Sequence, residues 1–110
     1  MIHAFFKRNK KDEIVSFEVT GHAGSGAYGT DIVCAGVSAL AIGTTNSLSI
    51  LGDFIPLVET SDETEGGYLY VELPLEINGK QLVTAQILLE SLLLSLKSIV
   101  EEYPEYVKLN

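Results

Sequence analysis

Two residues of this sequence have side chains suited to nucleophilic chemistry: Cys34, its one cysteine, and His22, one of its two histidines. They stand near the two ends of a glycine-rich stretch, GHAGSGAYGTDIVCA. A thiolate attacks carbonyl carbons, and a nearby imidazole can take the thiol proton and later protonate the leaving group. The pair therefore raises the hypothesis of a Cys-His enzyme.

The expected elements around the pair favour this hypothesis without deciding it. A strand is expected to end before His22, and a helix is expected to open at Asp31 or Ile32. Cys34 would then lie in the first helical turn, where N–H groups lack partners and the dipole favours an anion. The same N–H groups could hold an oxyanion. On these residues alone, the commoner interpretation is still that Cys34 is a small buried hydrophobe and His22 a polar residue at a strand end.

The glycines Gly24, Gly26 and Gly29 also match the G-x-G-x-x-G pattern of a nucleotide loop. Asp31 places a carboxylate where the phosphate would lie, and a 110-residue chain lacks the flanking units of a doubly wound fold. The glycines instead predict a flexible loop that closes over substrate. Its residues are Ala23, Gly24, Ser25, Gly26, Ala27, Tyr28, Gly29 and Thr30.

Two neighbours are candidates for supporting roles. Asp31 or Thr30 is expected to cap the helix, and Asp31 could also orient His22. Because a carboxylate opposes thiolate formation, Asp31 would have to point toward His22 rather than toward Cys34. Ser38 stands one helical turn beyond Cys34, where it either lines the same site or is simply a small packing residue.

Hydrophobic periodicity predicts the elements that position these residues. Alternation of apolar residues indicates strands, and apolar residues three and four apart indicate helices. The expected strands are 2–7, 14–20, 54–59, 68–73 and a short one at 106–109. The expected helices are 31–51, followed by Gly52, and 80–103, with an acidic loop at 61–67. The order ββαββα, with a possible closing strand, predicts one domain over 1–110, an α+β fold of two layers with two long helices packed on an antiparallel or mixed sheet.

Charge and composition limit the partners. Fifteen acidic residues against seven basic ones give a net charge of −8, which disfavours direct nucleic-acid binding and favours a basic partner. One cysteine and two histidines are too few for a structural zinc site, and no metal or cofactor is expected.

The apolar segments predict the compartment and the oligomeric state. Polar residues interrupt the most apolar segment, 82–100, so no membrane association is expected. The first residues, MIHAFFKRNKK, place charge after apolar residues, the reverse of a signal peptide, and a cytoplasmic protein is expected. Because the two long helices are too apolar for a lone small domain to cover, a homodimer is expected.

The stretch GHAGSGAYGTDIVCAGVSAL and the leucine-rich segment that ends in EEYP resemble the ribosomal-processing cysteine protease family, Prp. The resemblance spans most of the chain. It implies a cytoplasmic homodimer with His22 as general base and Cys34 as nucleophile. It also implies removal of an N-terminal extension from large-subunit ribosomal protein twenty-seven. The alternative is a non-catalytic ribosome-assembly or interaction module in which Cys34 belongs to the core.

Overall fold

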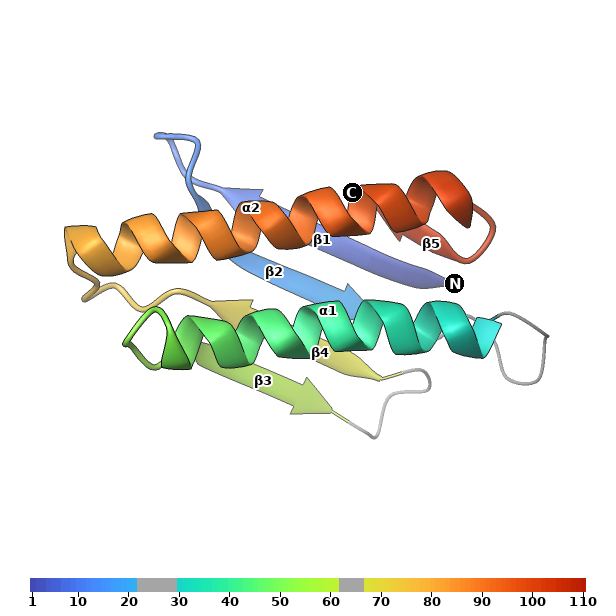
Figure 1. Ribbon diagram of the computed structural model, residues 1–110, viewed down its shortest axis with the longest axis horizontal. Coiled ribbons are helices and arrows are strands. Elements are labelled where there is room, and N and C mark those ends of the chain that lie inside the picture. The colour runs from blue at the N-terminus through green and yellow to red at the C-terminus, as the bar shows by residue number, and fades with distance from the viewer. Residues whose placement is uncertain (22–29, 62–66) are drawn as a thin grey trace.

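The computed structural model describes residues 1–21, 30–61 and 67–110, with the side chains of Thr30 and Asp31 left aside. Two helices cover one face of a five-stranded sheet (Figure 1). The elements in chain order are β1 Ile2–Arg8, β2 Ile14–Thr20, α1 Thr30–Ile50, β3 Leu57–Ser61, β4 Tyr68–Glu72, α2 Gly79–Glu102 and β5 Val107–Leu109. The predicted α+β domain and its element order are confirmed.

The sheet has the strand order β3-β4-β2-β1-β5. Neighbouring strands are antiparallel except β1 and β5, which are parallel. Phe6 of β1 lies opposite Phe17 of β2, and their rings stack with centroids 5.8 Å apart. Phe17 in turn lies opposite the buried Val71 of β4. The side chains on this face of the sheet therefore form one side of the hydrophobic core.

Local signals in the sequence fix the ends of the helices. Asn78 caps α2, since its side chain accepts a hydrogen bond from the Gln81 amide at 2.8 Å. The Gln81 side-chain oxygen in turn accepts a hydrogen bond from the Asn78 amide at 3.0 Å, which completes a capping box. The Gln81 side-chain amide also donates to the carbonyl of Asp53 at 2.6 Å. The start of α2 is thereby tied to the turn that follows α1.

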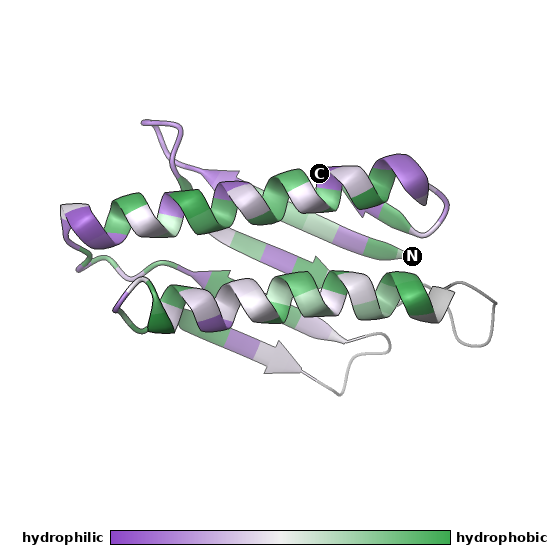
Figure 2. Cartoon of the chain, in the orientation of Figure 1, coloured by the Kyte–Doolittle hydropathy of each residue, from purple (hydrophilic) through white to green (hydrophobic). Residues whose placement is uncertain are grey.

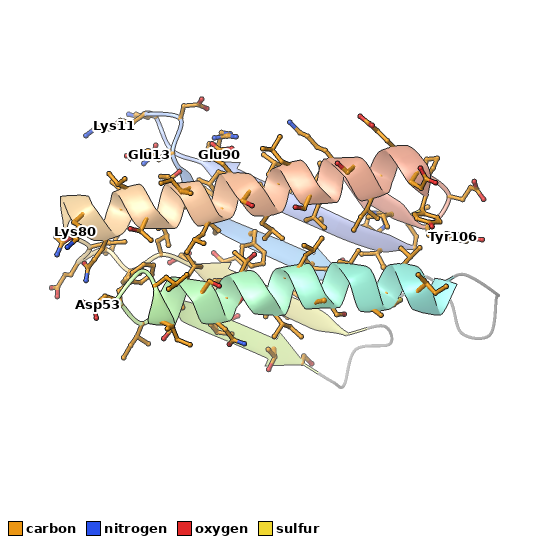
Figure 3. All side chains as sticks on the ribbon, viewed as in Figure 1. Lys11, Glu13, Asp53, Lys80, Glu90 and Tyr106 are labelled. Carbon is orange, nitrogen blue, oxygen red and sulfur yellow. The ribbon has the colours of Figure 1, made fainter. Side chains whose placement is uncertain are left out.

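A second set of polar contacts ties α2 to the β1–β2 hairpin. The Gln86 side chain accepts from the Ile14 amide and donates to the Ile14 carbonyl, both at 2.8 Å. Arg8 binds the Glu90 carboxylate through two nitrogen–oxygen contacts of 2.7 and 2.9 Å. Figure 3 shows Glu90 on α2 beside this hairpin. The contacts hold α2 in place over the sheet.

The third strand differs from its predicted range, because it spans Leu57–Ser61 instead of beginning at residue 54. After α1 the chain turns at Gly52 and Asp53, and Asp53 has a φ of 60°. Pairing with β4 starts at Leu57, after this turn and Pro56.

Both helices expose apolar side chains on the surface that faces away from the sheet. No charged residue occurs between Ile32 and Ile50 of α1. Figure 2 accordingly shows little hydrophilic colour on α1. The exposed apolar residues include Ile32, Ile42 and Ile50 on α1 and Val83, Ile87 and Leu94 on α2. By length and hydropathy both helices resemble membrane spans, contrary to the sequence-based expectation. The core helices of soluble proteins share these properties, and here both helices contribute side chains to the core.

Candidate active site

Cys34 lies one residue beyond the first four residues of α1, since the helix begins at Thr30. The sequence had placed it in the first turn, among the N–H groups that lack helical partners. The thiol remains close to that turn, because helical side chains lean toward the N-terminus and cover the preceding turn. Cys34 is half-buried and packs against the edge of the core.

The Cys34 side chain lines a pocket of about 280 Å³ between α1 and the sheet. The helical wall consists of Cys34, Val37, Ser38, Ala41 and Ile42. The opposite wall consists of Ile2, Val19, Gly21, Thr60, Ser61, Gly67, Tyr68 and Leu69. Ser38 and Ile42 on α1 and Thr60 on β3 are exposed, so the pocket opens between α1 and β3. Its lining is mostly apolar, which suits an apolar side chain.

Gly21 directly follows β2 at the wall of this pocket and precedes His22 in the chain. Its φ is 85°, and a Cβ added there would come within 2.4 Å of the Met1 carbonyl oxygen. The Gly21 amide donates to the Gly67 carbonyl at 3.2 Å. Only glycine meets both the positive φ and the close approach of the N-terminal backbone.

Of the other predicted site residues, some lie at the pocket and others lie outside the described part of the chain. Ser38 lines the pocket together with Cys34. The backbone of Asp31 lies within the first turn of α1, and its side chain lies outside the described part of the structure. His22 and the loop residues 23–29 lie outside the described part of the chain. The pairing of His22 with Cys34, the closing loop and the role of Asp31 stay predictions.

Sequence reasoning missed Gly21 and Thr60 as parts of the site. The signal for Gly21 was its place at the end of an alternating strand, where a glycine often marks a positive φ. Thr60 had no such signal, since the predicted strand stopped at residue 59. Its place in the pocket wall depends on how β3 pairs with β4, opposite Leu69.

Four of the five elements that line the pocket carry no lysine or arginine, the exception being β1, which contributes Ile2. Asp12 to Gly79 contains β2, α1, β3 and β4 and has no lysine or arginine. All seven basic residues lie in β1, in the hairpin turn, on α2 or on β5. Partial burial raises the pKa of Tyr68 in the pocket wall, and the carboxylates of Glu18 and Glu59 raise it further. This side of the molecule is suited to a basic polypeptide.

A half-buried thiol in a pocket between a helix and the edge of a sheet fits the class of cysteine hydrolases. The family model described as cysteine protease Prp matches residues 1–108, and the chain belongs to this family. The protein is a cysteine protease.

Relatives and solved structures agree with this assignment. The ribosomal processing cysteine protease Prp of Bacillus subtilis is 37% identical over 108 residues, covering 98% of this chain and 95% of the relative. A crystal structure of SMU.848 from Streptococcus mutans has a TM-score of 0.87 at 42% identity and covers 100% of this chain and 92% of that one. The crystal structure of Prp from Staphylococcus aureus in complex with a substrate peptide has a TM-score of 0.76 at 32% identity. The match covers 100% of this chain and 98% of that one.

Proposed function

We propose that the protein removes the N-terminal extension of large-subunit ribosomal protein twenty-seven during ribosome maturation. Its relatives in Bacillus subtilis and Staphylococcus aureus are named ribosomal processing cysteine proteases. The Staphylococcus aureus relative has been solved with a substrate peptide and with a covalently linked product peptide. The observation that carries the proposal is that Cys34 lines a pocket together with Gly21, the residue before His22.

The chemistry follows from a Cys-His dyad. His22 takes the proton from the Cys34 thiol, and the thiolate attacks the scissile carbonyl carbon. N–H groups at the start of α1 receive the oxyanion, since the Cys34 side chain covers that turn. His22 then protonates the leaving amine, and water hydrolyses the thioester. Gly21 lines the same pocket as Cys34. Because consecutive Cα atoms lie about 3.8 Å apart, the position of His22 directly after Gly21 in the chain supports this role.

The proposed partners follow from the surface. A ribosomal protein is basic, which complements the acidic elements around the pocket. A ribosomal-protein substrate and the acidic surface support a cytoplasmic enzyme that associates with no membrane and binds no nucleic acid directly. The exposed apolar residues of α1 and α2 support a homodimer that buries part of the helical surface.

A cleavage assay tests the proposed function. The substrate is the precursor of the ribosomal protein, incubated with wild-type enzyme, Cys34→Ala or His22→Ala and analysed by mass spectrometry. The wild type is expected to release the extension, and both variants are expected to leave the precursor intact while keeping wild-type circular dichroism. Near-normal turnover by Cys34→Ala would exclude Cys34 as the nucleophile. A precursor that stays intact with wild-type enzyme would favour the alternative, a non-catalytic interaction module.

A further inference from the structure

Strand β3 forms one edge of the sheet, and no described strand lies beyond it (Figure 1). It pairs with β4 in a regular register over all five of its residues. Proteins usually protect such edges with lysine, proline or a bulge, because an open edge pairs readily with other chains. Strand β3, with the sequence LVETS, contains no lysine, proline or bulge, although Pro56 directly precedes it and Glu59 is charged. Its Leu57 and Val58 are 55% and 46% exposed. A regular, largely apolar edge beside the pocket suggests that a chain binds there.

Two hydrogen bonds made by the residues that flank β4 show to which neighbouring strand each residue of β4 directs its N–H and C=O groups. The Gly21 amide donates to the Gly67 carbonyl, and the Leu73 amide donates to the Val15 carbonyl. In an antiparallel ladder, alternate residues direct their backbone groups to the same neighbour. Odd-numbered residues of β4 therefore bond to β2, and its even-numbered residues bond to β3.

The same alternation identifies the groups on the outer edge of β3. The even-numbered residues of β4 lie opposite Leu57, Glu59 and Ser61, which therefore bond inward. The N–H and C=O groups of Val58 and Thr60 point the other way, to the outer edge. Pro56 would come next in this series, but it has no N–H. The described edge thus offers two amides and two carbonyls, from Val58 and Thr60.

The side chains of these two residues lie on the face of the sheet that the helices cover. Val58 lies opposite the buried Val71, and Thr60 lies opposite Leu69. Thr60 and Leu69 both line the pocket that contains Cys34. A strand added at the edge would direct every second side chain to the mouth of this pocket, because side chains alternate between faces.

We infer that the substrate polypeptide binds as an additional β-strand on the outer edge of β3, through the N–H and C=O groups of Val58 and Thr60. The inference rests on the proposed function and specifies how that substrate is held. Backbone pairing supplies affinity, and the pocket selects the side chains. A basic substrate complements Glu59 and the acidic elements around the pocket, whereas a second copy of this chain would bring like charge.

A scan of N-methylated peptides tests the pairing with an unaltered edge. The probes are peptides across the cleavage junction of the ribosomal protein precursor, each methylated at one backbone nitrogen, with binding to Cys34→Ala measured by fluorescence anisotropy. Methylation of an amide that faces β3 removes one hydrogen bond and is expected to weaken binding about three- to tenfold. Methylation of the next amide, which faces solvent, is expected to have a smaller effect, so the losses should alternate.

A pair of variants tests the edge from the side of the protein. Val58→Pro removes the outward N–H without removing a bond to β4, and proline is tolerated on an edge with that geometry. Val58→Ala keeps the N–H and reports the cost of shortening the side chain. We expect kcat/KM to be about three- to tenfold lower in Val58→Pro than in Val58→Ala. Alkylation of Cys34 by iodoacetamide, which needs no peptide binding, should have the same rate in both.

The outcomes separate the docking mode from the proposed function. Alternating losses together with a lower kcat/KM in Val58→Pro support the inference. If the wild type binds the peptide without cleaving it, only the proposed function is refuted, and alternating losses together with weaker peptide binding to Val58→Pro than to Val58→Ala, by the same anisotropy measurement, still support the inference. Cleavage without alternation, or equal kcat/KM in the two variants, overturns the inference and leaves the protease function standing. A peptide that neither binds nor is cleaved overturns both. If Val58→Pro weakens self-association but not peptide binding, the edge belongs to a second copy and the inference is wrong.

Discussion

Cys34 of α1 and Gly21 at the end of β2 line the same pocket, although they come from different layers of the fold. The chain continues from Gly21 directly into His22. The strand before Gly21 and the helix that contains Cys34 both contribute buried side chains to one core, which fixes the two sides of the pocket.

The first prediction concerns the identity of the nucleophile atom. Cys34→Ser should lower kcat by about a thousandfold or more, because a hydroxyl is far harder to ionise than a thiol when only one histidine assists it. Steady-state cleavage of the precursor measures this loss, with circular dichroism as the control for folding. Activity within tenfold of wild type would show that sulfur is not required.

The second prediction concerns Gly21. Gly21→Ala is expected to destabilise the protein by about 1–3 kcal/mol, because alanine disfavours a positive φ. Its Cβ would also press against the Met1 carbonyl oxygen. Activity should fall even below the melting temperature, since the strand end that leads into His22 must shift. Thermal unfolding and kcat/KM at a low temperature measure the two effects.

Gly43→Ala is the matched control for Gly21→Ala. A Cβ at Gly43 has nothing within 4 Å, and the residue lies inside α1. Alanine there should stabilise the protein by about 0.5–1 kcal/mol with unchanged activity, because glycine is a poor helix former. Equal stability of the two variants would show that the backbone at Gly21 is not constrained.

The sequence predicted the fold well where the signals are local. The strand at Ile14–Thr20 followed from alternation, and the end of α1 followed from Gly52. The boundaries of β3 were missed, because they depend on the turn at Asp53 and on pairing with β4. The pocket wall at Thr60 was missed for the same reason, since a contact between distant segments leaves no periodic signal in either.

The third prediction concerns Gln86, whose structural role the sequence did not reveal. Gln86→Leu should cost about 1–3 kcal/mol of stability, because it leaves the amide and carbonyl of the buried Ile14 without their partner. Denaturant unfolding measures the loss. Ser98→Ala on the exposed side of α2 is the control and should change stability by less than about 0.5 kcal/mol. A similar small change in Gln86→Leu would contradict the prediction.

The fourth prediction concerns the ion pair between Arg8 and Glu90. The hydrogen bond from Arg8 is the main cause that lowers the pKa of Glu90. A lowered folded pKa means that the stabilisation is fully present above the unfolded pKa of about 4.3 and is lost as pH falls through the folded value. Glu90→Gln should therefore be less stable than wild type at pH 7, and the difference should shrink at pH 3 and in high salt. Unfolding curves at both pH values measure it, and a constant difference would contradict this origin.

The last prediction concerns the proposed homodimer. Ile87 and Leu94 are 65% and 64% exposed on α2, and three isoleucines of α1 are exposed on the same helical layer. Burying them against a second copy would remove apolar surface that a monomer leaves in water. We expect sedimentation at micromolar concentration to show a dimer for wild type and a monomer for Ile87→Glu, because an unpaired carboxylate is costly to bury. Lys10→Ala at the hairpin tip changes the net charge by the same amount and should remain dimeric. A wild-type protein that sediments only as a monomer would exclude the homodimer, and a dimeric Ile87→Glu would place the interface elsewhere.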